Sequence, residues 1–263
     1  MGYKTILLGK NEYVATITLN RPESLNAFTP ELSDELVHAL DETDHDEDIR
    51  VLIITGAGRG FCSGEDVKRR SVEGARIRDT RRVLDMKVRD PFPMILNNMM
   101  KPVIAAVNGP AVGQGLSLAL ACDIRIGSEN TRFGAIWTKR GIPPESCGAY
   151  NLVHIVGVAK ACELIFTGRI IEASEALNIG LLNRMVPADK LMSATMDMAK
   201  EIADGPPIAI AISKRTIYEV PRVDMMTHWQ TSCYALEYCS ETEDRKEGIR
   251  SFIEKRPPRF QGK

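Results

Sequence analysis

The sequence has little of what marks secreted or membrane-spanning proteins. Its first residues lead directly into an alternating, strand-like segment, without the charged lead and long apolar stretch of a signal peptide. No uninterrupted apolar run approaches the roughly 18 residues that a membrane span requires, and the best one, residues 103–107, is strand-sized. We therefore expect a cytoplasmic protein, or an organellar one that has lost a presequence, with no membrane partner.

Cysteine pairs of the kind that hold metals or staple small folds are also missing. The six cysteines form no C-x-x-C pair and no cluster with histidine, so we expect neither structural zinc nor a disulfide framework, and no metal site. Most should be reduced packing residues. Cys147 could act as a nucleophile, but no histidine that would activate its thiol lies near it in the sequence.

Neither sign of charge dominates, since the formal net charge is -1. Such a chain has no global field that would attract nucleic acid or an anionic membrane. One local cluster of lysine and arginine lies between residues 68 and 82, but acidic residues interrupt that region and no aromatics are interleaved. This pattern favours a solvated helix face over an RNA-binding surface, and we expect no nucleic-acid partner.

What the sequence does contain is a repeated alternation of strand and helix signals. The apolar patterns predict strands at 14–19, 51–55, 102–107 and 122–127, and helices at 30–41, 75–100 and 113–121. Thr29 is the expected N-cap of the first helix, with Pro30 at its first position. The fold class is therefore α/β, in which ligands usually bind at the carboxyl ends of the strands.

The last part of the chain reads differently. Beyond Met192 the strand signals vanish, and helical patterns broken at 205–207 and at Pro221 take over. We predict an α/β core over residues 1–192 and a helical C-terminal region over residues 193–263. Because a region of this size buries little apolar surface by itself, we expect it to pack on the core or on a neighbouring subunit.

Two glycine-rich turns follow two of the predicted strands, at 58–67 and at 109–115. Backbone amides that enter a helix are unsatisfied and partly positive, so one N–H from each turn could clamp a single carbonyl oxygen and stabilise an enolate. For one such turn alone, a plain glycine-rich loop is at least as good an explanation. Neither turn matches a phosphate loop or a dinucleotide fingerprint, which makes ATP and NAD poor candidates.

A carboxylate lies downstream of these turns. Glu145 belongs to the run 140–148, a tight turn with two prolines that should open a helix. A single carboxylate together with an oxyanion hole suggests an enzyme that moves a proton on an activated carbonyl compound. A surface glutamate near a helix N-terminus is the alternative interpretation.

Six motifs stand in order over nearly the whole chain. They are NRP with LNA at 20–27, GFCSGEDV at 60–67, KPVIAAVNG at 101–109, ACDIR at 121–125, TGR at 167–169 and DRKEG at 244–248. Together they resemble the crotonase (enoyl-CoA hydratase/isomerase) superfamily. The resemblance implies a spiral of β-β-α repeats with a helical C-terminal region, and a trimer or a dimer of trimers.

The resemblance also assigns site residues. It implies that the backbone N–H groups of Glu65 and Gln114 hold the carbonyl oxygen of an acyl-CoA thioester, and that the C-terminal helices reach a neighbour's site through Phe252 and Lys255. Coenzyme A is then part of the substrate, and no separate cofactor is expected. The other substrate-binding positions that it implies are Asn26, Ala27, Ser63, Gly64, Asp66, Val67, Gly113 and Trp137.

The chain departs from the family's hydratases at two positions. Those enzymes carry two glutamates, at positions that match Ser117 and Trp137 here, and a serine hydroxyl cannot replace a carboxylate at neutral pH. Glu145 instead matches the single catalytic glutamate of the family's Δ3,Δ2-enoyl-CoA isomerases. We therefore expect a double-bond shift in an enoyl-CoA, with the pKa of Glu145 raised if Trp137, Ile136 and Ile142 enclose it.

Three other functions stay open. Hydration of an enoyl-CoA or a cyclic dienoyl-CoA would need Glu145 and another water-holding group, such as Glu65. Hydrolysis of the dehalogenase type would use a nucleophilic Glu145 beside a tryptophan, but it also needs a basic imidazole, and none of the four histidines is obviously placed for that role. The third possibility is a non-catalytic CoA-binding protein.

Overall fold

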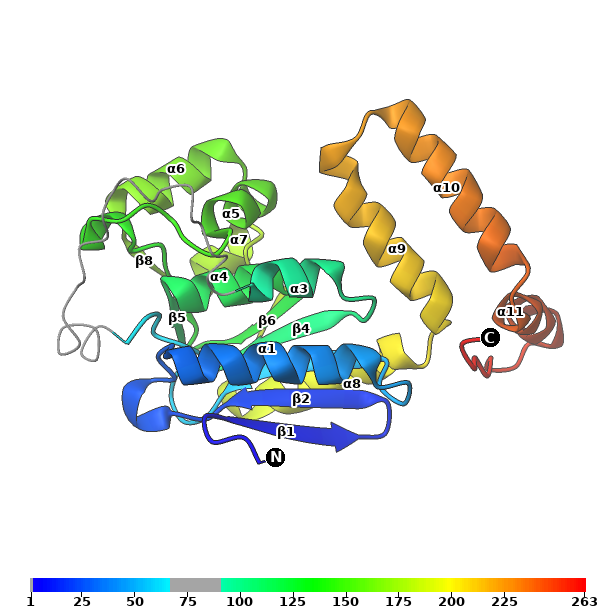
Figure 1. Cartoon of the computed structure of the whole chain (residues 1–263), viewed down its shortest axis with the longest axis horizontal. Helices are drawn as coiled ribbons and strands as arrows, with labels where there is room; N and C mark the ends of the chain where they lie inside the picture. Colours follow the sequence, from blue (N-terminus) through cyan, green and yellow to red (C-terminus); the bar gives the residue numbers. More distant parts are fainter. Residues whose placement is uncertain (1, 67–90) are drawn as a thin grey trace.

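A six-stranded sheet forms the centre of the structure, a computed structural model that describes residues 2–66 and 91–263 (Figure 1). The strand order is β1-β2-β3-β4-β6-β9; β1 runs antiparallel to β2, and all other neighbours are parallel. The α/β prediction and the four predicted strands are confirmed. The strands are β1 Ile6–Asn11, β2 Val14–Leu19, β3 Val51–Gly56, β4 Val103–Val107, β6 Ile124–Ser128 and β9 Arg184–Val186.

Helices cover both faces of this sheet, as the side chains of β3 show. Leu52 and Ile54 pack into the cluster with α1 (Pro30–His45), α3 (Phe92–Asn98) and α4 (Gln114–Ala121). Val51 and Ile53 face the other way, into the cluster with α8 (Leu191–Ala203). Because successive side chains of a strand point to opposite faces, a strand covered on both sides is apolar at every position, as this one nearly is.

The helix predicted at 30–41 is confirmed and is one turn longer. The side-chain oxygen of Thr29 accepts a hydrogen bond from the backbone N–H of Leu32 at 3.2 Å, which makes Thr29 the N-cap. Leu32, Leu36 and Leu40 lie on one face of α1 and are fully buried. This spacing of four residues keeps them on one side of the helix, against the sheet.

A smaller layer begins where β4 ends. Its three-stranded sheet has the order β5-β7-β8, from β5 (Pro110–Val112), β7 (Arg132–Gly134) and β8 (Ile170–Glu172). Three helices belong to this end of the molecule, α5 (Gly148–Val156), α6 (Val158–Thr167) and α7 (Ala173–Asn178) (Figure 1). The carboxyl end of β4 therefore leads directly into a second layer, and Cys62, after β3, pairs with Ala111 of β5 in this layer.

Three further helices form an arm on the other side of the molecule (Figure 1). They are α9 (Pro207–Glu219), α10 (Met225–Ser240) and α11 (Glu243–Glu254), in agreement with the helical prediction. The predicted boundary at residue 192 falls inside α8, however. Leu191, Ala194 and Ala199 of this helix pack against the central sheet, so the core described here extends to Ala203.

A buried ion pair fastens the arm to the core. Nζ of Lys214 on α9 lies 2.9 Å from Oδ2 of Asp123, and it also donates to the backbone oxygens of Leu96 and Lys101. The hydroxyl of Tyr218, one turn further along α9, donates to Oδ1 of Asp123 at 2.7 Å. Burial and the neighbouring carboxylate raise the pKa of Tyr218, which keeps it a neutral donor.

Some predictions fall outside the described residues. The cluster of cations between 68 and 82, Val67 and most of the helix predicted at 75–100 belong to this group; the described part of that helix, from residue 92 on, is α3. Among the helices of the described residues, none has both the length and the apolar character that crossing a membrane requires.

Candidate active site

The two glycine-rich turns lie against each other at the carboxyl ends of β3 and β4. The backbone N–H of Cys62 donates to the oxygen of Pro110 at 3.0 Å, and the N–H of Val112 donates to the oxygen of Cys62 at 2.9 Å. Cys62 and Ala111 thus form a parallel bridge. The sequence predicted two separate turns; the structure joins them into one short ladder.

Gly64 is one of the glycines at which these turns approach each other closely. Its φ of +92° lies in a region that side-chain-bearing residues rarely adopt, and a Cβ there would lie 2.8 Å from the oxygen of Val112 and 3.5 Å from the nitrogen of Gln114. Gln114 is the first residue of α4, so its N–H has no acceptor within the helix. The predicted donors at 65 and 114 therefore come from turns in direct contact.

The segment that contains Glu65 is itself held as a strand. Its neighbours pair with Phe28, whose N–H donates to the oxygen of Gly64 at 2.7 Å and whose oxygen accepts from the N–H of Asp66 at 2.9 Å. In the other turn, Gly113 has a φ of +55°, and a Cβ at this position would have no atom within 4 Å. The oxyanion role of Glu65 and Gln114 stays a prediction.

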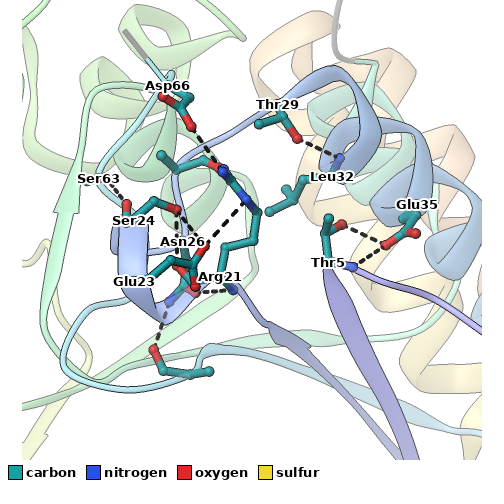
Figure 2. A network of polar contacts seen from close by, with 12 residues as sticks. Thr5, Arg21, Glu23, Ser24, Asn26, Thr29, Leu32, Glu35, Ser63 and Asp66 are labelled. Atoms are coloured by element: carbon teal, nitrogen blue, oxygen red, sulfur yellow. Dashed lines mark hydrogen bonds and ion pairs between the residues drawn. The ribbon is translucent and has the colours of Figure 1, made fainter. Parts of the chain in front are cut away.

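Arg21 lies at the centre of a network of polar contacts beside this turn, as Figure 2 shows. Its guanidinium donates to Oδ2 of Asp66 at 3.0 Å and to the backbone oxygen of Ala27 at 2.6 Å. Two positions predicted to bind substrate, 27 and 66, are thus held together by one side chain. This role of Arg21 was not predicted from the sequence, although the residue belongs to the NRP motif directly after β2.

Asn26 and Ser63 support the same turn from within. The amide of Asn26 donates to the oxygens of Ala57 and Gly60 at 2.9 Å each and accepts from the N–H of Arg21 at 2.8 Å (Figure 2). The hydroxyl of Ser63 donates to the oxygen of Ser24. Asn26 is fully buried within the single chain, and its contact with a substrate stays a prediction.

Glu145 lies in the turn that precedes α5, as predicted. The next two residues, Ser146 and Cys147, have φ values of +49° and +56°, in the left-handed region that costs residues other than glycine energy. The backbone oxygen of Glu145 accepts two hydrogen bonds, from the N–H of Gly148 at 2.8 Å and from Oγ of Ser117 at 3.0 Å. The turn is thereby tied to α4, the helix that begins at Gln114.

Trp137 and Ser117 border this turn from inside the protein. Trp137 is only 1% exposed, and its Nε1 has no hydrogen-bond partner among the described residues. Ser117 is fully buried. A Cβ on Gly148 would lie 2.8 Å from both Oγ of Ser117 and Cζ2 of the indole. At both positions where the resemblance predicts the loss of a water-holding glutamate, a buried side chain therefore packs against the turn.

The three apolar side chains predicted to enclose Glu145 differ in how deeply they are buried. Trp137 is buried and Ile136 half-buried, but Ile142 is 37% exposed and does not form a closed wall. Glu145 itself is half-buried. The raised pKa expected for this carboxyl stays a prediction.

Of the other candidate nucleophiles and bases, two cysteines are buried and two histidines are engaged in hydrogen bonds away from the turns. Burial raises the pKa of the thiols of Cys62 and Cys122 to about 12, whereas Cys147 is exposed. His38 on α1 bonds the hydroxyl of Tyr3, and His154 on α5 bonds the backbone oxygen of Tyr150. These positions give no support to a mechanism that needs a thiolate or an imidazole.

Phe252 and Lys255 do not reach the site of their own chain. Phe252 is on α11 and 85% exposed, and Lys255 directly follows this helix. Figure 1 shows α11 at the end of the arm, on the far side of the molecule from β5 and α4. A contact of these residues with a substrate therefore requires a second subunit.

Comparison with known proteins places this geometry among characterised chains. The family model described as Enoyl-CoA hydratase/isomerase matches residues 9–263. The chain is 36% identical over 261 residues to the short-chain-enoyl-CoA hydratase of Clostridium acetobutylicum, with 97% of each chain covered. It is 32% identical over 250 residues to the 1,2-epoxyphenylacetyl-CoA isomerase of Escherichia coli, with 95% of each covered.

Solved structures agree. The crystal structure of an enoyl-CoA hydratase from Bacillus anthracis superposes with a TM-score of 0.92 at 36% sequence identity, covering 99% of this chain and 100% of the other. The relatives thus include a hydratase and an isomerase, and both act on CoA thioesters by name.

Proposed function

The chain belongs to the enoyl-CoA hydratase/isomerase family, and we propose that within it this enzyme moves a double bond along an enoyl-CoA thioester. Both the α/β architecture and the resemblance predicted from the sequence are confirmed at the level of the family. The proposal concerns the reaction, for which the family's members differ.

In the proposed reaction Glu145 carries one proton between two carbons. Its carboxylate removes a proton from C2 of a 3-enoyl-CoA, and the electron pair moves through the double bond system to give a dienolate. The backbone N–H groups of Glu65 and Gln114 hold the thioester oxygen while it bears negative charge. Protonated Glu145 then returns the proton to C4, which yields the 2-enoyl-CoA and restores the carboxylate.

The observation that carries the proposal is the burial of Ser117 and Trp137, which stand at the positions that the resemblance matches to the two water-holding glutamates of the hydratases. The hydroxyl of Ser117 is engaged with the backbone of Glu145, and the indole of Trp137 packs against the same turn. Neither can ionise to activate water at neutral pH. A single carboxylate suffices for a proton shift, whereas addition of water needs a group that holds the water as well.

The substrate would enter past the Arg21 network. Ala27, Ser63, Gly64 and Asp66 lie on the segments that this network joins, and we assign them to the path of the coenzyme A moiety. Coenzyme A arrives as part of the substrate, and the reaction needs no further cofactor.

The test is an isomerisation assay with 3-enoyl-CoA substrates of several chain lengths. Wild-type enzyme should form the conjugated 2-enoyl-CoA, and Glu145→Gln should lower kcat by about 10²- to 10⁴-fold, the usual contribution of a general acid–base group. Glu12→Gln, which alters an exposed glutamate of the β1–β2 turn, is the matched control and should keep full activity. Equal rates for wild type and Glu145→Gln would refute the proposal.

Hydration is the second candidate, because relatives such as the Clostridium protein are named hydratases. In this reaction Glu145 would share a water molecule with another group, for which Glu65 is the nearest candidate in the predicted oxyanion turn. Incubation of linear 2-enoyl-CoAs and cyclic dienoyl-CoAs in water labelled with heavy oxygen distinguishes the two. Label in the product supports hydration; a shifted double bond without label supports isomerisation.

We further propose that the arm mediates assembly into a trimer or a dimer of trimers. No residue of α10 is buried within the single chain, and large apolar side chains lie exposed along it. Patches of this kind mark protein–protein contacts. A neighbour bound there would also bring Phe252 and Lys255 within reach of a site other than their own.

A further inference from the structure

We infer that Ser117 is a positioning residue for the reaction: its hydroxyl holds the backbone of Glu145 so that the carboxylate stands ready for proton transfer. The inference rests on the proposed function and extends it to a residue that does not touch the reacting atoms. It gives a role to the serine that stands where the family's hydratases carry a glutamate.

The first support is the contact itself. Oγ of Ser117 donates to the backbone oxygen of Glu145 at 3.0 Å, across 28 positions of sequence. Ser117 is fully buried, where water cannot replace a lost partner. Because the hydroxyl of Ser117 already donates its proton to a backbone oxygen, the hydroxyl is unsuited to acid–base chemistry on a substrate.

The second support is the conformation of the turn. Ser146 and Cys147 both adopt left-handed φ values directly after Glu145. Such a conformation is unfavourable for residues other than glycine and persists where surrounding contacts impose it. The hydrogen bond from Ser117 is such a contact, since it anchors the turn at the residue before the two strained positions.

The third support is the packing at Gly148. A Cβ at this position would lie 2.8 Å from Oγ of Ser117 and 2.8 Å from the indole of Trp137, so the turn rests on these two side chains without a gap. The indole contributes shape alone at this contact, whereas the serine contributes shape and a directed bond. Ser117 therefore decides where the turn sits along α4.

The fourth support is the origin of both parts of the site from one helix. Gln114, the predicted oxyanion donor, is the first residue of α4, and Ser117 lies in the same first turn of this helix. The bond from Ser117 thus fixes the acid relative to the oxyanion donor. Since a misplacement of about 1 Å can cost about 100-fold in rate, such a link matters for catalysis.

The experiment combines Ser117→Ala with Glu145→Gln and their double variant. We expect Ser117→Ala to lower kcat by about 10- to 100-fold with KM changed less than about twofold, because the defect concerns alignment and not binding. In the Glu145→Gln background the same change should have no further effect, since the carboxylate on which it acts is gone.

The matched control is Thr195→Val. Thr195 is also fully buried, and its hydroxyl donates to the backbone oxygen of Leu191 at 2.8 Å within α8, away from the turn. It should lower the melting temperature about as much as Ser117→Ala and leave kcat unchanged. A fall in kcat of similar size in both variants would overturn the inference, because a general loss of stability would then explain it.

A second measurement separates this inference from the proposed function. Amide hydrogen exchange of the segment 146–150 should become about tenfold faster in Ser117→Ala and stay unchanged in Thr195→Val, whatever reaction the enzyme catalyses. Absent isomerase activity in the wild type would refute the proposed function alone. Unchanged exchange, unchanged kcat, or an equal loss of kcat in the Glu145→Gln background would overturn the role of Ser117.

Discussion

The two tryptophans of this chain mark two regions built in opposite ways. Trp137 lies in the site, 1% exposed and packed against the glycine of a strained turn, whereas Trp229 lies on α10 and is 62% exposed. The site is closed by contacts within the chain, from the ladder at Cys62 to the bond at Ser117. In the arm, by contrast, large apolar side chains of α10 and α11 are exposed to solvent in the single chain.

This difference separates the part of the site that a single chain forms from the part that we expect a second subunit to supply. The turns that we propose to hold the thioester oxygen and to carry the acid consist only of residues of the core and the second layer. Phe252 and Lys255 are on the arm, whose own attachment to the core runs through a few polar contacts such as Lys214 with Asp123. Substitutions in the arm and in the site can test this division.

Among these substitutions, removal of Lys214, the buried cation that attaches α9 to the core, should have the largest effect, a loss in the free energy of unfolding. Lys214→Met leaves Asp123 without its ion-pair partner, and breaking a buried pair by removing one member costs about 3–5 kcal/mol. We expect a loss of about 3 kcal/mol in the free energy of unfolding in urea, since Asp123 is partly exposed and keeps the bond from Tyr218.

The control for this change is Lys246→Met, which removes the exposed lysine that pairs with Glu243. Exposed pairs contribute about 0–1 kcal/mol, so this variant should unfold almost as the wild type does. If both variants lost equally little stability, the arm would be held by its apolar contacts and not by the buried pair.

The second prediction compares two glycines of left-handed φ at the site. Gly64→Ala places a methyl group 2.8 Å from the oxygen of Val112 and should push the two turns apart, whereas the methyl group of Gly113→Ala meets open space. We expect kcat to fall by about 100-fold for Gly64→Ala, the size of a lost oxyanion donor, and much less for Gly113→Ala. Steady-state kinetics on both variants would measure this; equal losses would mean that backbone strain, not the contact between the turns, matters.

The third prediction concerns the uncovered face of α10. Trp229→Asp introduces a charge into the proposed contact between subunits and should shift the mass measured by light scattering towards the monomer. Activity should then fall by about tenfold, as the neighbour's Phe252 and Lys255 are lost. Leu7→Asp, at an exposed apolar position of β1, is the control; a Trp229→Asp variant with unchanged mass would contradict the proposed interface.

The smallest effect should come from the outermost contact of the arm, between Glu247 and Arg256. The hydrogen bonds from Arg256 lower the pKa of Glu247 from its ordinary 4.5 to about 2. A lowered pKa means that this contact stabilises the folded state fully above pH about 4.5 and is lost as the pH falls towards about 2. Comparison of wild type with Glu247→Gln in urea across this range should show a gap that closes on acidification; a gap independent of pH would contradict it.

The sequence predicted the elements well because their signals are local. Thr29 caps α1 as expected, and the apolar run at 51–55 forms a strand buried on both faces. The predicted boundary at residue 192 falls inside α8 because the sequence of an amphipathic helix is the same whether the helix covers its own sheet or a partner. Only contacts distant in sequence, such as those of Ala194 and Ala199 with the sheet, reveal which one it covers.

By itself the sequence determined the α/β alternation, the two glycine-rich turns and the carboxylate at position 145, since backbone preferences and side-chain chemistry depend on neighbours in the chain. The tertiary structure decided the rest. It joined the two turns at Gly64, placed Arg21 on Asp66 and tied Ser117 to the backbone of Glu145. These are pairings across dozens of residues, and only the folded chain specifies which polar group meets which.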